Sequence, residues 1–201
     1  MTDRNPVADI RKKKESGGRV RFLSDEERES LLAACRKPAW PSLHALVSLA
    51  ILTGARRGEL ITLKWSDIDL KTNRATVHDT KNGDPRVLPL FGKALDAIRE
   101  LKLQHSSRSE FVFPQPSGFP GPYLHFESHW YAALEAAGIE NLRFHDLRHT
   151  TASYLAQQGT SLLEIADTLG HRTMSMVKRY AHLTQTHKVS AIERMAKENG
   201  L

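Results

Sequence analysis

RFHDLRHTTASYLAQQGTSLLEIADTLGHRTMSMVKRY, residues 143–180, is the stretch from which the fold and the chemistry of this chain can be predicted. His145 and Arg148 stand three residues apart, so they share one face of a helix that begins near His145. An arginine fork matches two oxygens of a phosphate group. His171 follows a Leu-Gly pair where a helix should end, and the sharp turn there can present its side chain to a cleft. The pattern predicts a phosphate-handling site with Tyr180 at its far end.

Tyr180 needs help from its surroundings before it can act as a nucleophile. A phenol has a pKa near 10, so only about 0.1% of it is ionised at pH 7. Attack would require removal of its proton and an electrophile already polarised by positive charge. Taken alone, a tyrosine near a helix end is more typical of a packing residue.

A second cation comes from the segment TGARRGEL at residues 53–60. Arg56 lies just past the apolar segment 44–53, where it could bind a phosphate or take part in a surface salt bridge. Glu59, three residues later, is either a first-turn helix carboxylate or the group that orients a neighbouring arginine or histidine.

The spacing of His145 and His149 also resembles the H-E-x-x-H motif of zinc proteases. The general-base glutamate of that motif is replaced here by the shorter Asp146. Arg148 would place a positive charge beside the metal. We therefore predict that the chain has no metal site.

The rest of the chain predicts a mainly α fold with a small three-stranded antiparallel sheet. Ser24 and Glu27 form a capping box that opens a helix running to about residue 35, and the apolar segment 44–53 is expected to be the central core helix. Asn82-Gly83 is a hairpin signal, with Lys81 entering the turn. The other expected helices are 57–63, 93–103, 126–137, 146–158, 161–169, 174–180 and 188–197, and the expected strands are 67–70, 75–78 and 86–90.

Composition indicates an anionic partner and a reducing compartment. The chain has 201 residues, 40% of them apolar, a formal charge of +6 and a pI of about 9.5. A basic balance favours nucleic acid as the partner, with an acidic membrane surface as the second choice. The single cysteine, Cys35, excludes an internal disulfide and is expected to be a core thiol. No apolar run approaches the roughly 18 residues of a membrane helix, so we expect a soluble, cytoplasmic protein.

Six residues, in order and each within its flanking motif, resemble the catalytic domain of the tyrosine recombinases, the phage integrase family. That family's pattern is an arginine in T-G-x-R-x-x-E-L, a lysine in a β-hairpin turn, H-x-x-R, L-G-H and a tyrosine before A-H. The resemblance covers about residues 22–191, most of the chain. The matching residues are Arg56, Lys81, His145, Arg148, His171 and Tyr180.

This resemblance implies an enzyme that cleaves and rejoins DNA strands through a 3′-phosphotyrosine intermediate, without metal, cofactor or ATP. Two alternatives stay open: relaxation of DNA, as by a type IB topoisomerase, and a DNA-binding module that no longer cleaves. The implied roles are nucleophile for Tyr180, charge neutralisation for Arg56, Arg148 and His171, general acid for Lys81, acceptor or relay of the tyrosine proton for His145, and support for Glu59.

The resemblance also implies how the chain is divided and what it binds. Residues 1–20 resemble an interdomain linker and are expected to be a basic, flexible tether, whereas residues 21–201 form the catalytic domain. Full-length members usually carry a core-binding domain before this one, so we expect a fragment or a minimal member. Segment 181–201 is expected to dock on a neighbouring protomer or else to cover its own core.

The implied partner is double-stranded DNA in a prokaryotic or phage setting. We expect a tetramer of protomers on paired DNA sites, with a monomer as the option for the free protein, and no membrane partner. Candidate DNA-contacting residues are Arg11, Lys12, Lys13, Lys14, Arg143, Arg172, Lys178 and Arg179.

Overall fold

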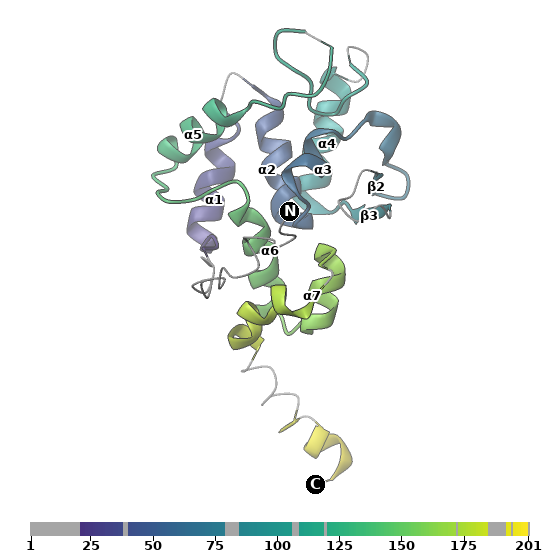
Figure 1. Ribbon diagram of the computed structural model, residues 1–201, viewed down its shortest axis with the longest axis vertical. Coiled ribbons are helices and arrows are strands. Elements are labelled where there is room, and N and C mark those ends of the chain that lie inside the picture. The colour runs from purple at the N-terminus through teal and green to yellow at the C-terminus, as the bar shows by residue number, and fades with distance from the viewer. Residues whose placement is uncertain are drawn as a thin grey trace, which may run out of the picture.

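The fold is mainly helical with one small antiparallel sheet, as predicted (Figure 1). The computed structural model describes residues 21–37, 40–78, 85–105, 109–118, 120–171, 173–184, 192–193 and 195–200. Its α-helices are α1 (Asp25–Ala34), α2 (Ser42–Thr53), α3 (Arg57–Ile61), α4 (Gly92–His105), α5 (Glu127–Ala136), α6 (Asp146–Gln157) and α7 (Leu162–Leu169). Its 3₁₀ helices are η1 (Trp65–Asp67), η2 (Met174–Met176) and η3 (Lys178–Thr184), and its strands are β1 (Ile68–Asp69), β2 (Arg74–Val77) and β3 (Arg86–Pro89).

Local sequence signals explain where several helices begin and end. The predicted capping box at Ser24 and Glu27 is present at the start of α1, and a second one formed by Ser161 and Glu164 opens α7. The α2 and α7 helices both end in a left-handed glycine, Gly54 with φ 59° and Gly170 with φ 64°. These two helix ends are neighbours in the structure.

The sheet has the order β1-β2-β3, with both pairs antiparallel. Ala75 and Val77 on β2 and Leu88 on β3 are buried, because alternate residues of a strand point to the same face. The predicted turn with Lys81 connects β2 to β3 but lies outside the described residues.

Two hydrophobic clusters build the molecule, and α6 belongs to both. The larger cluster surrounds α2, which is buried on nearly every side and packs against α4 and α6, as expected for a central core helix. The smaller cluster lies between α6, α7 and η3. Leu147 near the start of α6 belongs to the larger cluster, whereas Ala152 and Ala156 belong to the smaller one. The boundary between the two clusters therefore falls along α6, between Leu147 and Ala152.

The expected α-helix over 174–180 is wrong, because the chain forms the two 3₁₀ helices η2 and η3 there. A 3₁₀ helix has three residues per turn, so residues three apart lie on the same side. Val177 and Tyr180 are fully buried in the smaller cluster, and Leu183 packs against it. The tighter helix therefore directs all three side chains into one core.

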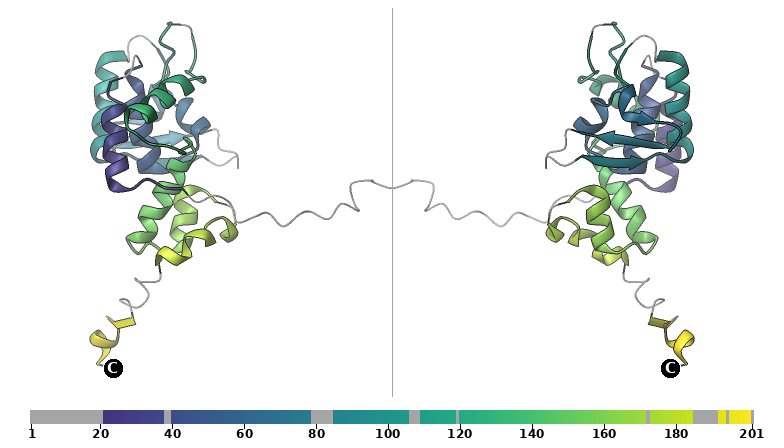
Figure 2. Two further views of the ribbon diagram at one scale, coloured as in Figure 1. Left: turned by 90° about the vertical axis from the view of Figure 1, so that its left-hand side faces the viewer. Right: turned by 90° about the vertical axis from the view of Figure 1, so that its right-hand side faces the viewer.

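Other expectations concern the single thiol, the C-terminal segment and the membrane. Cys35 is buried as predicted, and burial raises its pKa to about 12. The helical residues 192–193 and 195–199 lie apart from the body of the domain in all views (Figures 1 and 2). Within the described ranges, every helix is too short or too polar to cross a membrane.

Candidate active site

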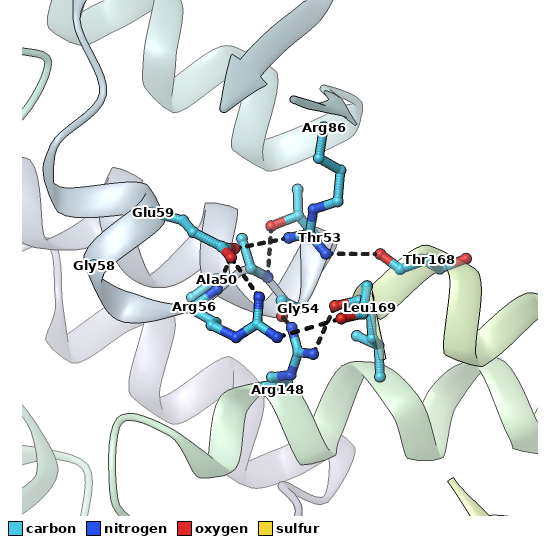
Figure 3. A network of polar contacts seen from close by, with 12 residues as sticks. Ala50, Thr53, Gly54, Arg56, Gly58, Glu59, Arg86, Arg148, Thr168 and Leu169 are labelled. Atoms are coloured by element: carbon cyan, nitrogen blue, oxygen red, sulfur yellow. Dashed lines mark hydrogen bonds and ion pairs between the residues drawn. The ribbon is translucent and has the colours of Figure 1, made fainter. Parts of the chain in front are cut away.

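Arg148 is the most deeply placed cation of the site. It lies in the first turn of α6 with 4% of its surface exposed. Its Nη1 donates to the carbonyl of Gly54 over 2.7 Å and its Nη2 to the carbonyl of Leu169 over 2.6 Å (Figure 3). These carbonyls close α2 and α7, and the negative end of a helix dipole favours a cation. Burial, followed by the charge of Arg56, lowers the pKa of Arg148 to about 10, so it remains charged at pH 7.

Arg56 and Glu59 form a partly buried ion pair at the start of α3, in which the arginine side chain is 27% exposed. Glu59 accepts hydrogen bonds from Arg56 Nη1 over 2.7 Å and from the Arg56 backbone N–H over 2.8 Å. The carboxylate side chain is only 3% exposed. Arg56 Nη2 also donates to the carbonyl of Gly170 over 3.3 Å, so it reaches the same helix end as Arg148. Glu59 therefore orients Arg56 and is also a carboxylate in the first turn of α3, so both possibilities that its position suggested hold.

A third guanidinium, that of Arg86, completes the cluster. Its Nη2 donates to the second oxygen of Glu59 over 3.0 Å, and its Nη1 donates to the carbonyl of Thr168 over 3.2 Å (Figure 3). Burial lowers the pKa of Arg86, while Glu59 opposes that shift. Three arginines from α6, α3 and β3 thus converge around one carboxylate and the end of α7.

Tyr180 is docked in the site, with its hydroxyl against the ring of His149. The hydroxyl and His149 Nδ1 form a short hydrogen bond, and the two ring centroids are 6.1 Å apart. Burial raises the pKa of Tyr180 to about 12, although the charges of Arg179 and Arg148 oppose this. Burial lowers the pKa of His149 to about 4, so its ring is neutral at pH 7. A neutral imidazole nitrogen can accept the phenolic hydrogen.

His145 and His171 are the two other histidines of the site. His145 is the N-cap residue of α6, and its ring meets that of His149 edge to face at 5.5 Å. Burial and then the charge of Arg148 lower the pKa of His145. The backbone N–H of His171 bonds to the carbonyl of Ala166 over 2.8 Å, which fixes the turn after α7. Its Nδ1 is buried and has no partner among the described residues, and burial lowers its pKa to about 4.

The predicted DNA-contacting residues are only partly described. Arg143 and Lys178 are exposed, and Arg179 is half-buried. The charge of Arg179 acts on Tyr180 and on the nearby histidines, so this residue belongs to the electrostatic surroundings of the site. Lys81, Arg172 and the run Arg11–Lys14 lie outside the described residues.

Two residues of the site were not selected from the sequence. The sequence indicates His149 only as a possible metal ligand, although its position directly after Arg148 is a signal for the same cluster. Arg86 was placed in a strand without a role. Its signal is strand alternation, because a residue two before the buried Leu88 must point to the same inner face.

The arrangement suits transfer of a phosphoryl group to a phenol. A proton acceptor contacts the hydroxyl, and Arg56 and Arg148 supply fixed positive charge from rigid helix ends. Preorganised donors of this kind stabilise charge that develops in a transition state. Among the described residues, no group of three or more His, Cys, Asp or Glu side chains could hold a metal ion.

Comparisons with known proteins agree with this geometry. The model of the phage integrase family matches residues 21–187. The integrase of Salmonella phage P22 is 34% identical over 200 residues, and the match covers 93% of this chain and 49% of that protein. A shufflon-specific DNA recombinase of Escherichia coli is 35% identical over 191 residues, covering 94% of this chain and 47% of the relative. The chain therefore spans about half the length of these curated relatives.

A solved structure accounts for the matched part. The catalytic domain of bacteriophage HP1 integrase superposes with a TM-score of 0.67 at 27% identity, covering 91% of this chain and 99% of that domain. This chain therefore matches nearly the whole of that catalytic domain.

Proposed function

Because the chain belongs to the phage integrase family, we propose that it is the catalytic domain of a site-specific DNA recombinase, which cuts and rejoins DNA through a phosphotyrosine bond. The observation that carries this proposal is the docked Tyr180, whose hydroxyl contacts a neutral His149 beside the buried Arg148. The described relatives are integrases and recombinases, so relaxation of DNA without exchange is not favoured.

The first step is attack of the Tyr180 oxygen on phosphorus. The phenolic proton passes to Nδ1 of His149, which is already in contact with the hydroxyl. This assignment differs from the sequence prediction that His145 takes the proton. Arg56 and Arg148 neutralise the negative charge that gathers on the non-bridging oxygens, with His171 as a further donor. Each such preorganised donor contributes about 3–4 kcal/mol in enzymes where it has been measured.

The second half of the step breaks the bond between phosphorus and the 5′-oxygen. Lys81 protonates that oxygen as it leaves, so the products are a 3′-phosphotyrosine and a free 5′-hydroxyl. General acid catalysis of this kind contributes about 10²–10⁴-fold. A 5′-hydroxyl of a partner strand then attacks the phosphotyrosine and releases the phenol. The bond energy is conserved, so ATP is not needed.

Covalent trapping tests the proposal. The protein is mixed with nicked duplexes tiled across the DNA that flanks its own gene, in EDTA, and the products are separated on a denaturing gel. We expect a protein–DNA adduct from the wild-type chain and none from Tyr180→Phe. Failure of the wild-type chain to form an adduct on every duplex, even after the preceding part of a longer relative is fused to it, would favour a non-cleaving DNA-binding module.

We also infer the assembly and the setting. Residues 21–201 act as the catalytic domain behind a basic tether, 1–20, on double-stranded DNA in a prokaryotic or phage-infected cytoplasm. Four protomers assemble on two paired sites. Because η3 keeps residues 181–184 on the smaller core of their own chain, the part of segment 181–201 that follows η3 docks on a neighbouring protomer. Supporting this, the side chains of Ile192 and Met195 are exposed instead of covering the core of their own chain.

A further inference from the structure

Arg86 is the charged residue of the cluster that no motif explains. It is the first residue of β3 and pairs with Val77 at the end of β2. Its side chain points to the inner face together with Leu88, while Val87 between them is 55% exposed. The strand therefore directs a guanidinium into the protein, where a hydrophobic residue would be typical.

The contacts of Arg86 join three elements that are distant in sequence. Its two terminal nitrogens reach the carboxylate of Glu59 on α3 and the carbonyl of Thr168 near the end of α7 (Figure 3). The guanidinium also lies over Gly170, because a Cβ there would be 3.2 Å from Arg86 Nη1. A side chain at position 170 would press on this arginine.

Stability alone is a poor explanation for this arrangement. Arg86 shares a single carboxylate with Arg56, and the charge of Arg56 lowers its pKa further. Its Nε is buried without a hydrogen-bond partner among the described residues. A largely buried cation with an unsatisfied N–H costs free energy that a well-packed apolar residue would not cost.

Arg86 is instead well placed to hold the β2–β3 hairpin against the site. Lys81 lies five residues before it in the sequence, in the segment that connects β2 to β3. His171 lies directly after Gly170, and Arg56 shares the carboxylate with Arg86. Contacts to Glu59 and to the end of α7 fix the start of β3, the strand that follows the segment with Lys81 in the sequence.

Resting on the proposed function, we infer that Arg86 is a positioning residue that anchors the β2–β3 hairpin so that Lys81 delivers its proton to the leaving 5′-oxygen. In this assignment Arg86 holds the carboxylate of Glu59 and the carbonyl of Thr168, whereas Arg56 and Arg148 are the arginines that neutralise the phosphate. The loss of Arg86 should therefore resemble the loss of the general acid more than the loss of a phosphate ligand.

A sulfur leaving group separates these two kinds of defect. In DNA with a bridging 5′-sulfur, the leaving group is a thiolate, with a pKa of about 8.5 like that of a cysteine. Such a group leaves without a general acid, whereas a 5′-oxygen needs one. Phosphate ligands remain necessary for both substrates.

The experiment compares Arg86→Met, Arg86→Lys, Lys81→Met and, as a matched control, Arg74→Met. Arg74 is an exposed arginine on the neighbouring strand β2. Single-turnover cleavage is measured at saturating DNA, with 5′-oxygen and 5′-sulfur substrates. We expect Arg86→Met to lose roughly 10²-fold on the oxygen substrate, as for a misplaced catalytic group, and to approach the wild-type rate on the sulfur substrate. Arg86→Lys should lose less, because one ammonium can still reach one acceptor, and Arg74→Met should match the wild type.

Two results would overturn the inference while leaving the proposed function intact. One is an unchanged rate of Arg86→Met on the oxygen substrate, and the other is an equal loss on both substrates, which would assign Arg86 to phosphate binding or to folding. If the wild-type chain formed no adduct on either substrate, the proposed function would fail, and the inference with it.

Hydrogen exchange in the DNA-free protein provides a readout that does not depend on cleavage. Arg86→Met should raise amide exchange in β2, in β3 and at the end of α7, but not in α1 or α5. Unchanged exchange in the hairpin would show that Arg86 does not anchor it, whatever the cleavage rates are.

Discussion

At the scale of single residues, the proposed chemistry depends on the contact between Tyr180 and His149. Burial raises the pKa of Tyr180 to about 12, so roughly one molecule in 10⁵ would hold a phenolate at pH 7 without a proton acceptor. Burial lowers the pKa of His149 to about 4, so its ring is neutral from about pH 5 upwards. The site therefore keeps the acceptor ready at the pH where the nucleophile itself is unreactive.

This pairing predicts a distinct effect of His149→Gln. The amide can still hydrogen-bond the hydroxyl but cannot take up its proton, so we expect a loss of about 10²-fold in adduct formation at pH 7. The remaining activity should rise as the pH is raised from 6 to 9, because it depends on the small ionised fraction of Tyr180. Rates of adduct formation across this pH range would check this.

His145→Gln is the matched comparison, because His145 lies one helical turn earlier on the same side of α6. The loss of adduct formation in His145→Gln should be smaller and less dependent on pH than the loss in His149→Gln. A larger and pH-dependent loss in His145→Gln would return the role of proton acceptor to His145, as the sequence predicted. Tyr180→Phe should be inactive at every pH.

At the scale of elements, Arg148 is positioned by two helix ends that meet. The carbonyl of Gly54 at the end of α2 holds one nitrogen, and the carbonyl of Leu169 in the last turn of α7 holds the other. Gly54 has a φ of 59°, and a Cβ there would lie 2.3 Å from Leu169 Cδ2 and 3.2 Å from the side chain of Thr151. The absence of a side chain at Gly54 is thus what allows α2 to approach α7.

Gly54→Ala should weaken both the fold and the site. The left-handed backbone and the close contact should together cost about 1–3 kcal/mol in free energy of unfolding. Cleavage should fall further than this loss of stability explains, because the displaced Gly54 carbonyl also orients Arg148. Urea unfolding and adduct formation by the folded fraction measure the two effects separately.

Gly58→Ala provides the control within the same segment. A Cβ at Gly58 meets nothing within 4 Å, and the residue lies in the first turn of α3. Alanine is favoured over glycine in a helix by up to about 1 kcal/mol, so this variant should be as stable as the wild type or slightly more stable. If Gly54→Ala behaved like Gly58→Ala, the close approach of α2 and α7 would not depend on the glycine.

The elements were predictable wherever a local signal decided them. The capping box at Ser24, the apolar run of α2 and the glycine ends of α2 and α7 could be read from neighbouring residues. The 3₁₀ form of η3 could not be predicted in this way, because it depends on the packing of Val177 and Tyr180 in the smaller cluster. The role of Arg86 could not be predicted from the sequence for a similar reason, because its partners Glu59 and Thr168 are 27 and 82 residues away.

At the scale of the whole molecule, the site lies where two hydrophobic cores meet. The larger core fixes α2 and the first turn of α6, while the smaller one holds α7 and η3 with Tyr180. The nucleophile and its cations are therefore carried by different cores that are joined through α6. A change in the smaller core could move Tyr180 without displacing Arg56.

The smaller core is already closed by η3, whose last residue, Thr184, is buried. The later helical residues contribute nothing comparable, since Ile192 is 63% exposed and Met195 is 47% exposed. Removing residues 186–201 should therefore leave the melting temperature of the free protein nearly unchanged. If this segment docks on a neighbouring protomer, the same deletion should abolish the tetramer on paired DNA sites while binding to a single site persists.

Analytical ultracentrifugation with paired and single sites would measure both properties of the deletion variant. A matched substitution, Ile192→Asp with Met195→Asp, keeps the full length and removes only the apolar contacts, so it should reproduce the loss of assembly. Tetramers that form equally well after the deletion would contradict docking of this segment. A large drop in melting temperature would show instead that the segment covers its own domain, because only apolar surface that is buried in the free protein can stabilise its fold.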